Sequence, residues 1–316
     1  MRDEPILVLD PDAAELVAAL RARAPAEAQR FLACPSPDAL TTDAALARIC
    51  LGTPDAVRAA AERLPELRWI QSTWAGIRPL LPLLAERPEL QLTGVKDIFG
   101  PLMSEYVFGW ILALERRLFD YAVQQQAGVW RQLPLRRFCG RHLVVLGTGS
   151  IGHHIATVGG ALGLTVSGVS RSGRAVVGID EVHPVARLAE AVEGADYLVS
   201  VVPDTAETRN LIDRRVLAAL APGAVLVNVG RGSAVVDADL VAVLTEGRLG
   251  AAVLDVFREE PLPVTHPFWT TPNLHLTPHV AAETLADDIA GLFLTNLARW
   301  QAGDPLAHLV DPAHGY

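Results

Sequence analysis

Three ionisable side chains follow three separate apolar segments in the second half of the chain. Arg231 comes directly after AVLVNVG, Glu260 comes shortly after AAVLDVF, and His279 comes directly after LHLTP. An imidazole can donate a proton near neutral pH, a carboxylate can orient the imidazole, and a guanidinium can hold an anion or polarise a carbonyl. The set therefore fits reduction of a carbonyl group, in which hydride adds to carbon and a proton adds to oxygen.

The three apolar segments are typical of strands in a parallel sheet, whose carboxyl ends lie at one edge. Each residue also has an ordinary interpretation: His279 as a helix cap, Glu260 as a solvated loop charge, and Arg231 as a surface arginine. The agreement of three separate loops favours one catalytic site over these alternatives. The sequence has no Ser/His/Asp pattern and no cluster with metal-ligand spacing, so we expect no metal.

A glycine-rich turn lies upstream, in the segment LVVLGTGSIGHHIA. Gly147, Gly149 and Gly152 form G-x-G-x-x-G between an apolar strand and a helix. In such a turn the first glycine allows the tight bend, the second lets a pyrophosphate approach, and the third lets helix and strand pack closely. The amides of Ser150 and Ile151 would face the phosphates at the helix N-terminus. This setting predicts a dinucleotide-binding domain rather than a plain tight turn.

The residues after the next strand indicate which dinucleotide is bound. An NAD site usually has an acid there, which bonds the ribose hydroxyls. This chain instead has Ser170, Arg171, Ser172 and Arg174, in GVSRSGR. Guanidinium groups bind phosphate well, so we expect NADP(H) to be preferred over NAD(H). The alternative is a solvated basic turn.

The elements that must position these residues form two alternating series. Predicted strands of the first series are 6–10, 48–52, 68–72 and 90–95, with helices at 12–23 and 54–64. Predicted strands of the second are 142–147, 164–170, 196–203, 223–230, 250–257 and 274–279. A long helix is predicted at 101–115, and another at 283–300 that carries an apolar face of Leu285, Ile289, Leu292, Phe293, Leu297 and Trp300.

Alternation of strands and helices predicts an α/β fold with parallel sheets. We expect two Rossmann-like or flavodoxin-like lobes with a ligand cleft between them. Residues 1–98 with 283–316 would form the substrate-binding, or catalytic, domain, to which the last helix returns. Residues 99–282 would form the dinucleotide-binding Rossmann domain.

Composition narrows the class of partner. The formal net charge of −9 argues against nucleic acid or an anionic membrane as the main partner. The N-terminus resembles no signal peptide, and the longest membrane-like run, 107–114, is too short to span a bilayer. Cys34, Cys50 and Cys139 form neither a CxxC pair nor a disulfide framework, which fits a reducing cytoplasm. We expect a cytoplasmic protein that binds a small molecule.

At these same residues the chain resembles the D-isomer-specific 2-hydroxyacid dehydrogenases. The segments GTGSIG, VPDTAETRNLID, NVGRG, LDVFREEPLP and TPHVAA match that family in order and spacing. The resemblance implies His279 as acid/base, Glu260 as its partner, and Arg231 as anchor of the substrate carboxylate and carbonyl. It also implies cofactor contacts at Val202, Pro203, Thr208 and Val229, with Asp255 binding the nicotinamide amide.

The segment STWAGI resembles the family's substrate loop. The amides of Ala75 and Gly76 would bind the substrate carboxylate, and Trp74 would shape the pocket. The alternative is a strand-to-helix turn with one core aromatic residue. The segments SRSGR and EYVFGWILALERR are most similar to the glyoxylate/hydroxypyruvate reductase branch, but WAGIR replaces that branch's commoner GAGVD and leaves the substrate open.

The resemblance implies NADP(H)-dependent reduction of a small 2-oxo acid, such as glyoxylate or hydroxypyruvate, to the 2-hydroxy acid. It also implies a homodimer that forms through an arm at 101–137, from which Trp130 is a candidate to reach the partner's cleft. Two alternatives stay open: a dinucleotide-sensing binding protein of the corepressor type, and a dehydrogenase of the same fold that oxidises an unusual donor such as phosphite.

Overall fold

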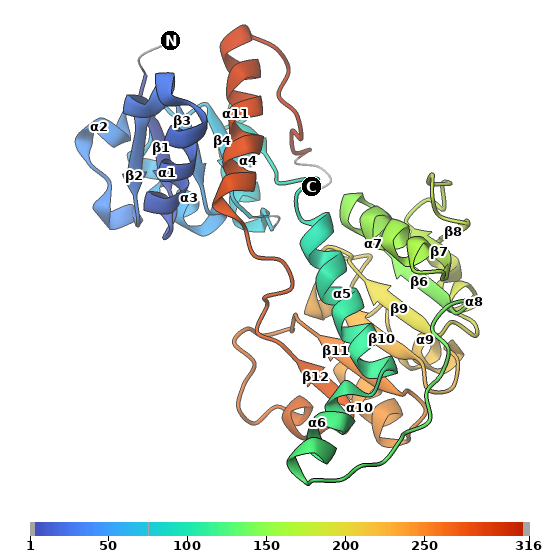
Figure 1. The fold of residues 1–316 in the computed structure, drawn as a ribbon. Helices are drawn as coiled ribbons and strands as arrows, with labels where there is room; N and C mark the ends of the chain where they lie inside the picture. The colour runs from blue at the N-terminus through green and yellow to red at the C-terminus, as the bar shows by residue number, and fades with distance from the viewer. Residues whose placement is uncertain (1–3, 75, 312–316) are drawn as a thin grey trace. The chain divides into compact units, whose positions relative to one another are not determined.

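The computed structural model describes residues 4–74 and 76–311. The chain divides into two compact units (Figure 1). The first unit contains the described residues up to Ile98 together with those from Thr284 onward. The second unit spans Phe99–Glu283.

The first unit is built on a five-stranded parallel sheet with the order β2-β1-β3-β4-β5. This is the flavodoxin-like strand order. The strands are β1 (Ile6–Leu9), β2 (Phe31–Cys34), β3 (Ile49–Gly52), β4 (Trp69–Ser72) and β5 (Gln91–Thr93). The helices are α1 (Ala13–Arg23), α2 (Thr42–Ala45), α3 (Pro54–Ala60), α4 (Leu81–Glu86) and α11 (Ala286–Ala302).

Helix α11 comes from the far end of the chain and packs against α1 (Figure 1). Its face of Ile289, Phe293 and Leu297 is buried. Trp69 of β4 stacks on Phe293, with ring centroids 5.3 Å apart. Leu285, predicted on this apolar face, instead precedes the first turn of the helix and is 47% exposed. The apolar face therefore begins one turn later than the sequence pattern indicated.

A buried polar network also fixes α11 to the sheet. Asn296 donates from Nδ2 to Gln71 Oε1 at 3.2 Å, and Thr93 donates from Oγ1 to the same oxygen at 2.7 Å. Gln71 in turn donates from Nε2 to the carbonyl oxygen of Gly94 at 3.1 Å. Because buried polar groups are costly when unpaired, this network specifies how α11 docks.

The second unit is built on a seven-stranded parallel sheet with the order β12-β11-β10-β9-β6-β7-β8. This is the Rossmann order with one further strand, and the strand order reverses between β6 and β9. The strands are β6 (His142–Leu146), β7 (Thr165–Ser170), β8 (Glu181–Pro184), β9 (Tyr197–Ser200), β10 (Val225–Asn228), β11 (Ala251–Leu254) and β12 (Leu274–Leu276). The α/β fold with parallel sheets is therefore confirmed.

The helices of this unit are α5 (Gly100–Glu115), α6 (Leu118–Gln126), α7 (Ser150–Ala161), α8 (Leu188–Ala191), α9 (Arg214–Ala219) and α10 (Asp237–Thr245). Helices α5 and α7 pack side by side. Gly159 of α7 faces both Leu143 of β6 and Phe108 of α5, and an added Cβ there would lie 2.8 Å from Leu143 Cδ2. The glycine thus lets α7 approach the start of β6.

Strands β2 and β8 and helix α6 are among the elements outside the ranges predicted from the sequence. The β8 segment EVHP is short and partly exposed, lies at an edge of the sheet and ends in proline, so it lacks a buried-strand pattern. The α6 segment contains Tyr121 and a run of glutamines, and its exposed apolar residues hide the helical period.

Among the described residues, no helix is long and apolar enough to cross a membrane. In the same residues, no group of three His, Cys, Asp or Glu side chains could hold a metal ion.

Candidate active site and dinucleotide-binding turn

The turn between β6 and α7 depends on its three glycines for different reasons. Gly147 has φ +102°, and an added Cβ would lie 3.1 Å from Val201 at the end of β9. At Gly152 an added Cβ would overlap the carbonyl oxygen of Gly147 and lie 2.9 Å from its carbon. At Gly149 an added Cβ would meet nothing within 4 Å, so the space above this residue is open.

This open space lies at the N-terminus of α7, which begins at Ser150. No side chain among the described residues caps the first turn of α7. Uncapped N–H groups and the helix dipole favour an anion at such a position. The turn therefore has room for the pyrophosphate of a dinucleotide, which the amides of Ser150 and Ile151 beside Gly149 would hold.

The predicted ribose-side residues lie in the tight turn after β7. Ser170 Oγ accepts a hydrogen bond from Gly173 N at 3.0 Å, and Ser172 Oγ accepts one from Arg174 N at 3.4 Å. The side chains of Arg171 and Arg174 are exposed. The pKa of Glu207 is lowered first by a backbone hydrogen bond, and the charge of Arg171 adds to this effect. The charge of Arg171 therefore acts on the loop that follows β9.

The loop after β9 contains the other predicted cofactor contacts. Thr208 donates from Oγ1 to the carbonyl oxygen of Pro203 at 2.5 Å and accepts from Thr205 N at 2.8 Å. Val202 and Val229 are buried where β9 and β10 end. A Cβ at Gly230 would lie 2.7 Å from Val202 N, so the two strand ends are in close contact.

Arg231 is presented by a turn that Asn228 shapes. Asn228 accepts from Gly230 N at 3.2 Å and donates to the carbonyl oxygen of Arg231 at 3.0 Å. Burial lowers the pKa of the Arg231 guanidinium, and the carboxylates of Glu260 and Asp204 act in the opposite direction. An arginine stays charged at neutral pH despite such a shift. The guanidinium is thus a partly buried cation within electrostatic reach of Glu260.

Glu260 and His279 form a direct pair at the ends of β11 and β12. His279 Nδ1 lies 2.8 Å from Glu260 Oε2, and Phe257 N donates to Glu260 Oε1 at 2.8 Å. Both carboxylate oxygens therefore have partners, which fixes the carboxylate. Because the contact with Glu260 uses Nδ1, Nε2 is the ring nitrogen that can meet a substrate.

Asp255 holds the turn that carries His279. Its side chain is buried, with the residue 1% exposed, and it accepts from Val280 N and Ala281 N, each at 2.9 Å. The N–H of His279 donates to the carbonyl oxygen of Asp255 at 2.9 Å. His279 has φ +57°, a left-handed conformation that is uncommon outside glycine. The bonds to Asp255 on both sides of His279 stabilise this conformation.

Two residues behind this turn had not been expected to take part. Thr277 donates from Oγ1 to Asp255 Oδ1 at 2.6 Å, and Tyr106 Oη lies 2.5 Å from the same Thr277 oxygen. Because the hydroxyl hydrogen of Thr277 points to Asp255, Tyr106 must be the donor to Thr277. Burial raises the pKa of Tyr106 to about 12, so it keeps this hydrogen at neutral pH. Thr277 could have been noticed from its place two residues before His279, whereas nothing local singles out Tyr106.

The predicted substrate loop follows β4 in the first unit. Ser72 Oγ donates to the carbonyl oxygen of Trp74 at 2.7 Å and accepts from Trp74 N at 3.1 Å. Trp74 is 46% exposed, so it is not a core aromatic residue. Gly76 is partly buried, and Ala75 lies outside the described residues. Thr284 donates to the carbonyl oxygen of Thr73 at 3.1 Å, which fixes the start of the loop.

Comparison with known proteins identifies the family. Residues 108–281 match the model of the D-isomer specific 2-hydroxyacid dehydrogenase, NAD binding domain. A glyoxylate/hydroxypyruvate reductase A from Serratia proteamaculans is 36% identical over 214 residues, which are 68% of this chain and 68% of that protein.

Two solved structures are similar over nearly the whole chain. A D-isomer specific 2-hydroxyacid dehydrogenase family protein from Aeromonas salmonicida is 42% identical, with a TM-score of 0.90 over 98% of this chain and 99% of that one. An NADPH-dependent glyoxylate/hydroxypyruvate reductase from Sinorhizobium meliloti, solved with NADP and sulfate, is 30% identical, with a TM-score of 0.84 over 99% of this chain and 100% of that one. This chain belongs to the D-isomer specific 2-hydroxyacid dehydrogenase family, in its glyoxylate/hydroxypyruvate reductase branch, and is an NAD(P)-dependent oxidoreductase.

Proposed function

We propose that this protein reduces a small 2-oxo acid to the 2-hydroxy acid, with NADPH as the preferred hydride donor. The observation that carries the proposal is the His279–Glu260 pair, 2.8 Å apart, at the same sheet edge as Arg231 and the glycine turn. A proton donor, its carboxylate partner and an anion-binding cation are the groups that this reduction needs.

Each residue has a separate task in this mechanism. Arg231 holds the substrate carboxylate and polarises the 2-oxo group. His279 donates its Nε2 proton to the carbonyl oxygen, while Glu260 orients the ring through Nδ1. The bound nicotinamide supplies the hydride. Asp255 holds the His279 turn through bonds from Val280 and Ala281, and its carboxylate would bind the nicotinamide amide.

The preference for NADPH rests on the turn after β7. Arg171 and Arg174 are exposed there beside two serine hydroxyls, and a 2′-phosphate would meet these cations instead of a carboxylate. The Sinorhizobium meliloti relative, which is NADPH-dependent, supports the same preference here. Val202, Pro203, Thr208 and Val229 would line the remainder of the cofactor site.

The substrate side is proposed from the loop after β4. The amides of Ala75 and Gly76 would bind the substrate carboxylate, and the exposed Trp74 would shape the pocket. Ile77 is buried in the core of the first unit, so it acts on the pocket only through the backbone. Glyoxylate and hydroxypyruvate, for which the relatives are named, are the first substrates to test.

A homodimer is proposed on the exposed apolar residues of the predicted arm. Trp130 is 100% exposed, and Phe119, Val123 and Leu135 are exposed as well. Exposed apolar groups at this density are typical of protein interfaces. Light scattering after size exclusion should give twice the chain mass, and a monomer at micromolar concentration would refute the dimer.

The test of activity follows the loss of reduced nicotinamide absorbance with NADPH and NADH in parallel. The substrates are glyoxylate, hydroxypyruvate, pyruvate, phenylpyruvate and 2-ketoisocaproate. We expect rapid NADPH oxidation with one or two of them, and His279→Gln should lower kcat by orders of magnitude while NADPH still binds. Arg171→Ala should raise KM for NADPH far more than for NADH.

Two results would overturn the proposal. Tight NADPH binding without turnover of any 2-oxo acid would indicate a dinucleotide-sensing protein. Reduction of NADP+ by phosphite, with negligible 2-oxo acid activity, would indicate a different donor for the same fold.

A further inference from the structure

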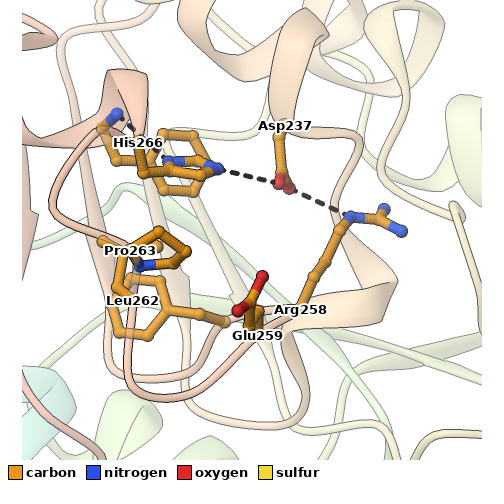
Figure 2. Close-up of a pocket in the computed structure, with 8 residues that line it drawn as sticks. Asp237, Arg258, Glu259, Leu262, Pro263 and His266 are labelled. Carbon is orange, nitrogen blue, oxygen red and sulfur yellow. Dashed lines mark hydrogen bonds and ion pairs between the residues drawn. The ribbon is translucent and has the colours of Figure 1, made fainter.

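Arg258 lies two residues before Glu260, beside a small pocket of about 210 Å³ (Figure 2). Figure 2 shows Asp237 between Arg258 and His266. Arg258 donates from Nε to Asp237 Oδ1 at 3.1 Å, and His266 Nε2 lies 3.5 Å from Asp237 Oδ2. One edge of the guanidinium is thus fixed at the start of α10.

The Nη2 nitrogen of the same guanidinium reaches further loops. Arg258 Nη2 donates to Asn210 Oδ1 at 2.6 Å, to the carbonyl oxygen of Ser233 at 3.3 Å, and to the carbonyl oxygen of Val235. Asn210 belongs to the loop after β9, whereas Ser233 and Val235 belong to the loop after β10. With its own loop after β11, Arg258 therefore joins three consecutive loops at the carboxyl edge of the sheet.

Each of these loops carries a residue of the proposed site. Thr208 lies in the loop after β9, Arg231 in the loop after β10, and Glu260 in the loop after β11. The last two loops are also in backbone contact, because a Cβ at Gly232 would overlap the backbone of Phe257. Phe257 is the residue whose N–H donates to Glu260.

We propose that Arg258 is a positioning residue that fixes the Arg231 turn and the Glu260 turn relative to each other, and both relative to the loop after β9. The inference rests on the proposed function, since it assigns Arg258 a task in the same reaction. It touches neither substrate nor cofactor in this role. It acts by holding Arg231 at a fixed position relative to the Glu260–His279 pair.

The geometry requires a guanidinium rather than any cation. Arg258 makes contacts from two nitrogens to acceptors on different loops, which suits the planar fork of arginine. Lysine carries one compact ammonium and cannot reach all of these acceptors at once. The single ion pair with Asp237 is part-exposed and would contribute little alone. The function of Arg258 therefore lies in bridging, which Arg258→Lys should restore only in part.

The experiment compares Arg258→Met, Arg258→Lys and Arg214→Met. Arg214 is a matched control because it also makes an exposed ion pair in this unit, with Glu246 at 2.9 Å, but Glu246 lies at the C-terminal end of α10 rather than at its start. We expect kcat/KM for the 2-oxo acid to fall about 10-fold to 100-fold in Arg258→Met, as for misplacements near 1 Å. Arg258→Lys should recover part of this loss, and Arg214→Met should stay within twofold of the wild type.

The turnover number separates positioning from simple folding support. If the Arg231 turn and the Glu260 turn shift relative to each other, kcat should fall in Arg258→Met even at a temperature where the variant is fully folded. A variant that is only less stable would keep the wild-type kcat at that temperature. That result, or a kcat/KM within twofold of the wild type, would overturn the proposal.

Two further measurements cover poor folding and failure of the proposed function. Asp237→Asn removes the negative charge of one partner of Arg258 and keeps its shape, so it should show the same changes in kcat and kcat/KM at smaller size. Hydrogen exchange of the cofactor-free protein should be faster in 204–212, 230–237 and 257–263 together in Arg258→Met. If exchange is faster in Arg258→Met but the wild-type protein turns over no 2-oxo acid, the proposed function is refuted. If the wild-type protein turns over a 2-oxo acid but exchange in Arg258→Met is unchanged, the bridging role of Arg258 is refuted.

Discussion

Three Gly→Ala changes in one short segment separate the tasks of the dinucleotide-binding turn. Gly149, Gly152 and Gly160 all lie in or next to α7. An added Cβ meets nothing within 4 Å at Gly149 and Gly160, but overlaps the Gly147 carbonyl at Gly152. The same added methyl group is therefore harmless to the fold at two positions and disruptive at the third.

The size of the effect at Gly152 follows from the contact distances. An added Cβ would lie 2.9 Å from the carbonyl carbon of Gly147. Carbon atoms pack best at about 3.5 Å or more, so turn and helix must separate by at least about 0.6 Å. Overpacking of this kind costs about 3 kcal/mol. For a unit of this size that corresponds to a fall in Tm of about 6–12 °C, and NADPH affinity should fall as well.

Gly149→Ala should behave differently, because its methyl group would enter the open space proposed for the pyrophosphate. We expect a Tm within about 1 °C of the wild type, together with a loss of NADPH affinity of about 100-fold, or near 2.7 kcal/mol. Gly160→Ala is the control. It should bind NADPH normally and raise stability by about 0.5–1 kcal/mol, because alanine favours a helix.

Thermal unfolding and a fluorescence titration with NADPH measure both quantities on all three variants. The reasoning about the turn would be refuted by wild-type NADPH affinity in Gly149→Ala. In that case the pyrophosphate does not lie over this residue. An unchanged Tm in Gly152→Ala would refute the packing argument separately.

Two further predictions concern the second unit. Thr277→Val removes the hydroxyl between Tyr106 and Asp255 and should lower the free energy of unfolding, measured with urea, by about 1–3 kcal/mol. The value of kcat should fall as well. Thr277→Ser keeps the hydroxyl and should lose much less, and equal losses in both variants would contradict this account. Burial lowers the pKa of His275 below its ordinary 6.5, so the unfolded chain takes up a proton first and stability falls as pH drops below about 6.5. His275→Phe keeps a ring between Trp110 and Phe119 and should reduce the difference in unfolding free energy between pH 7.5 and 5.5, whereas an unchanged difference would show that His275 does not contribute.

The sequence predicted best those features that depend on local patterns. Strands such as β6 and β10 are continuous apolar runs, and the glycines of the β6–α7 turn have a fixed spacing. The common edge of Arg231, Glu260 and His279 was predicted from one topological rule, since parallel strands end at a common edge. The resemblance to the family implied that Glu260 is the partner of His279. Strand β2 was missed because FLAC is short and lies between a 3₁₀ turn and a bend.

The missing parts of the site are side chains whose partners are distant in the sequence. Tyr106 meets Thr277 across 171 positions, and no local pattern encodes that contact. Arg258 is one exposed arginine among many until its acceptors on other loops are known. Asp255 was expected only as a cofactor contact, because its bonds to Val280 and Ala281 depend on how the β12 loop folds back.

The docking of α11 on α1 has a consequence for the order of folding. The second unit is continuous in the chain, whereas the first unit needs segments from both sides of it. During synthesis, residues 4–98 must wait for the whole second unit before α11 can cover Trp69. Until then the first unit exposes the ring of Trp69 to other chains. Docking of α11 on α1 is therefore the step after which the ring of Trp69 no longer favours aggregation of the nascent protein.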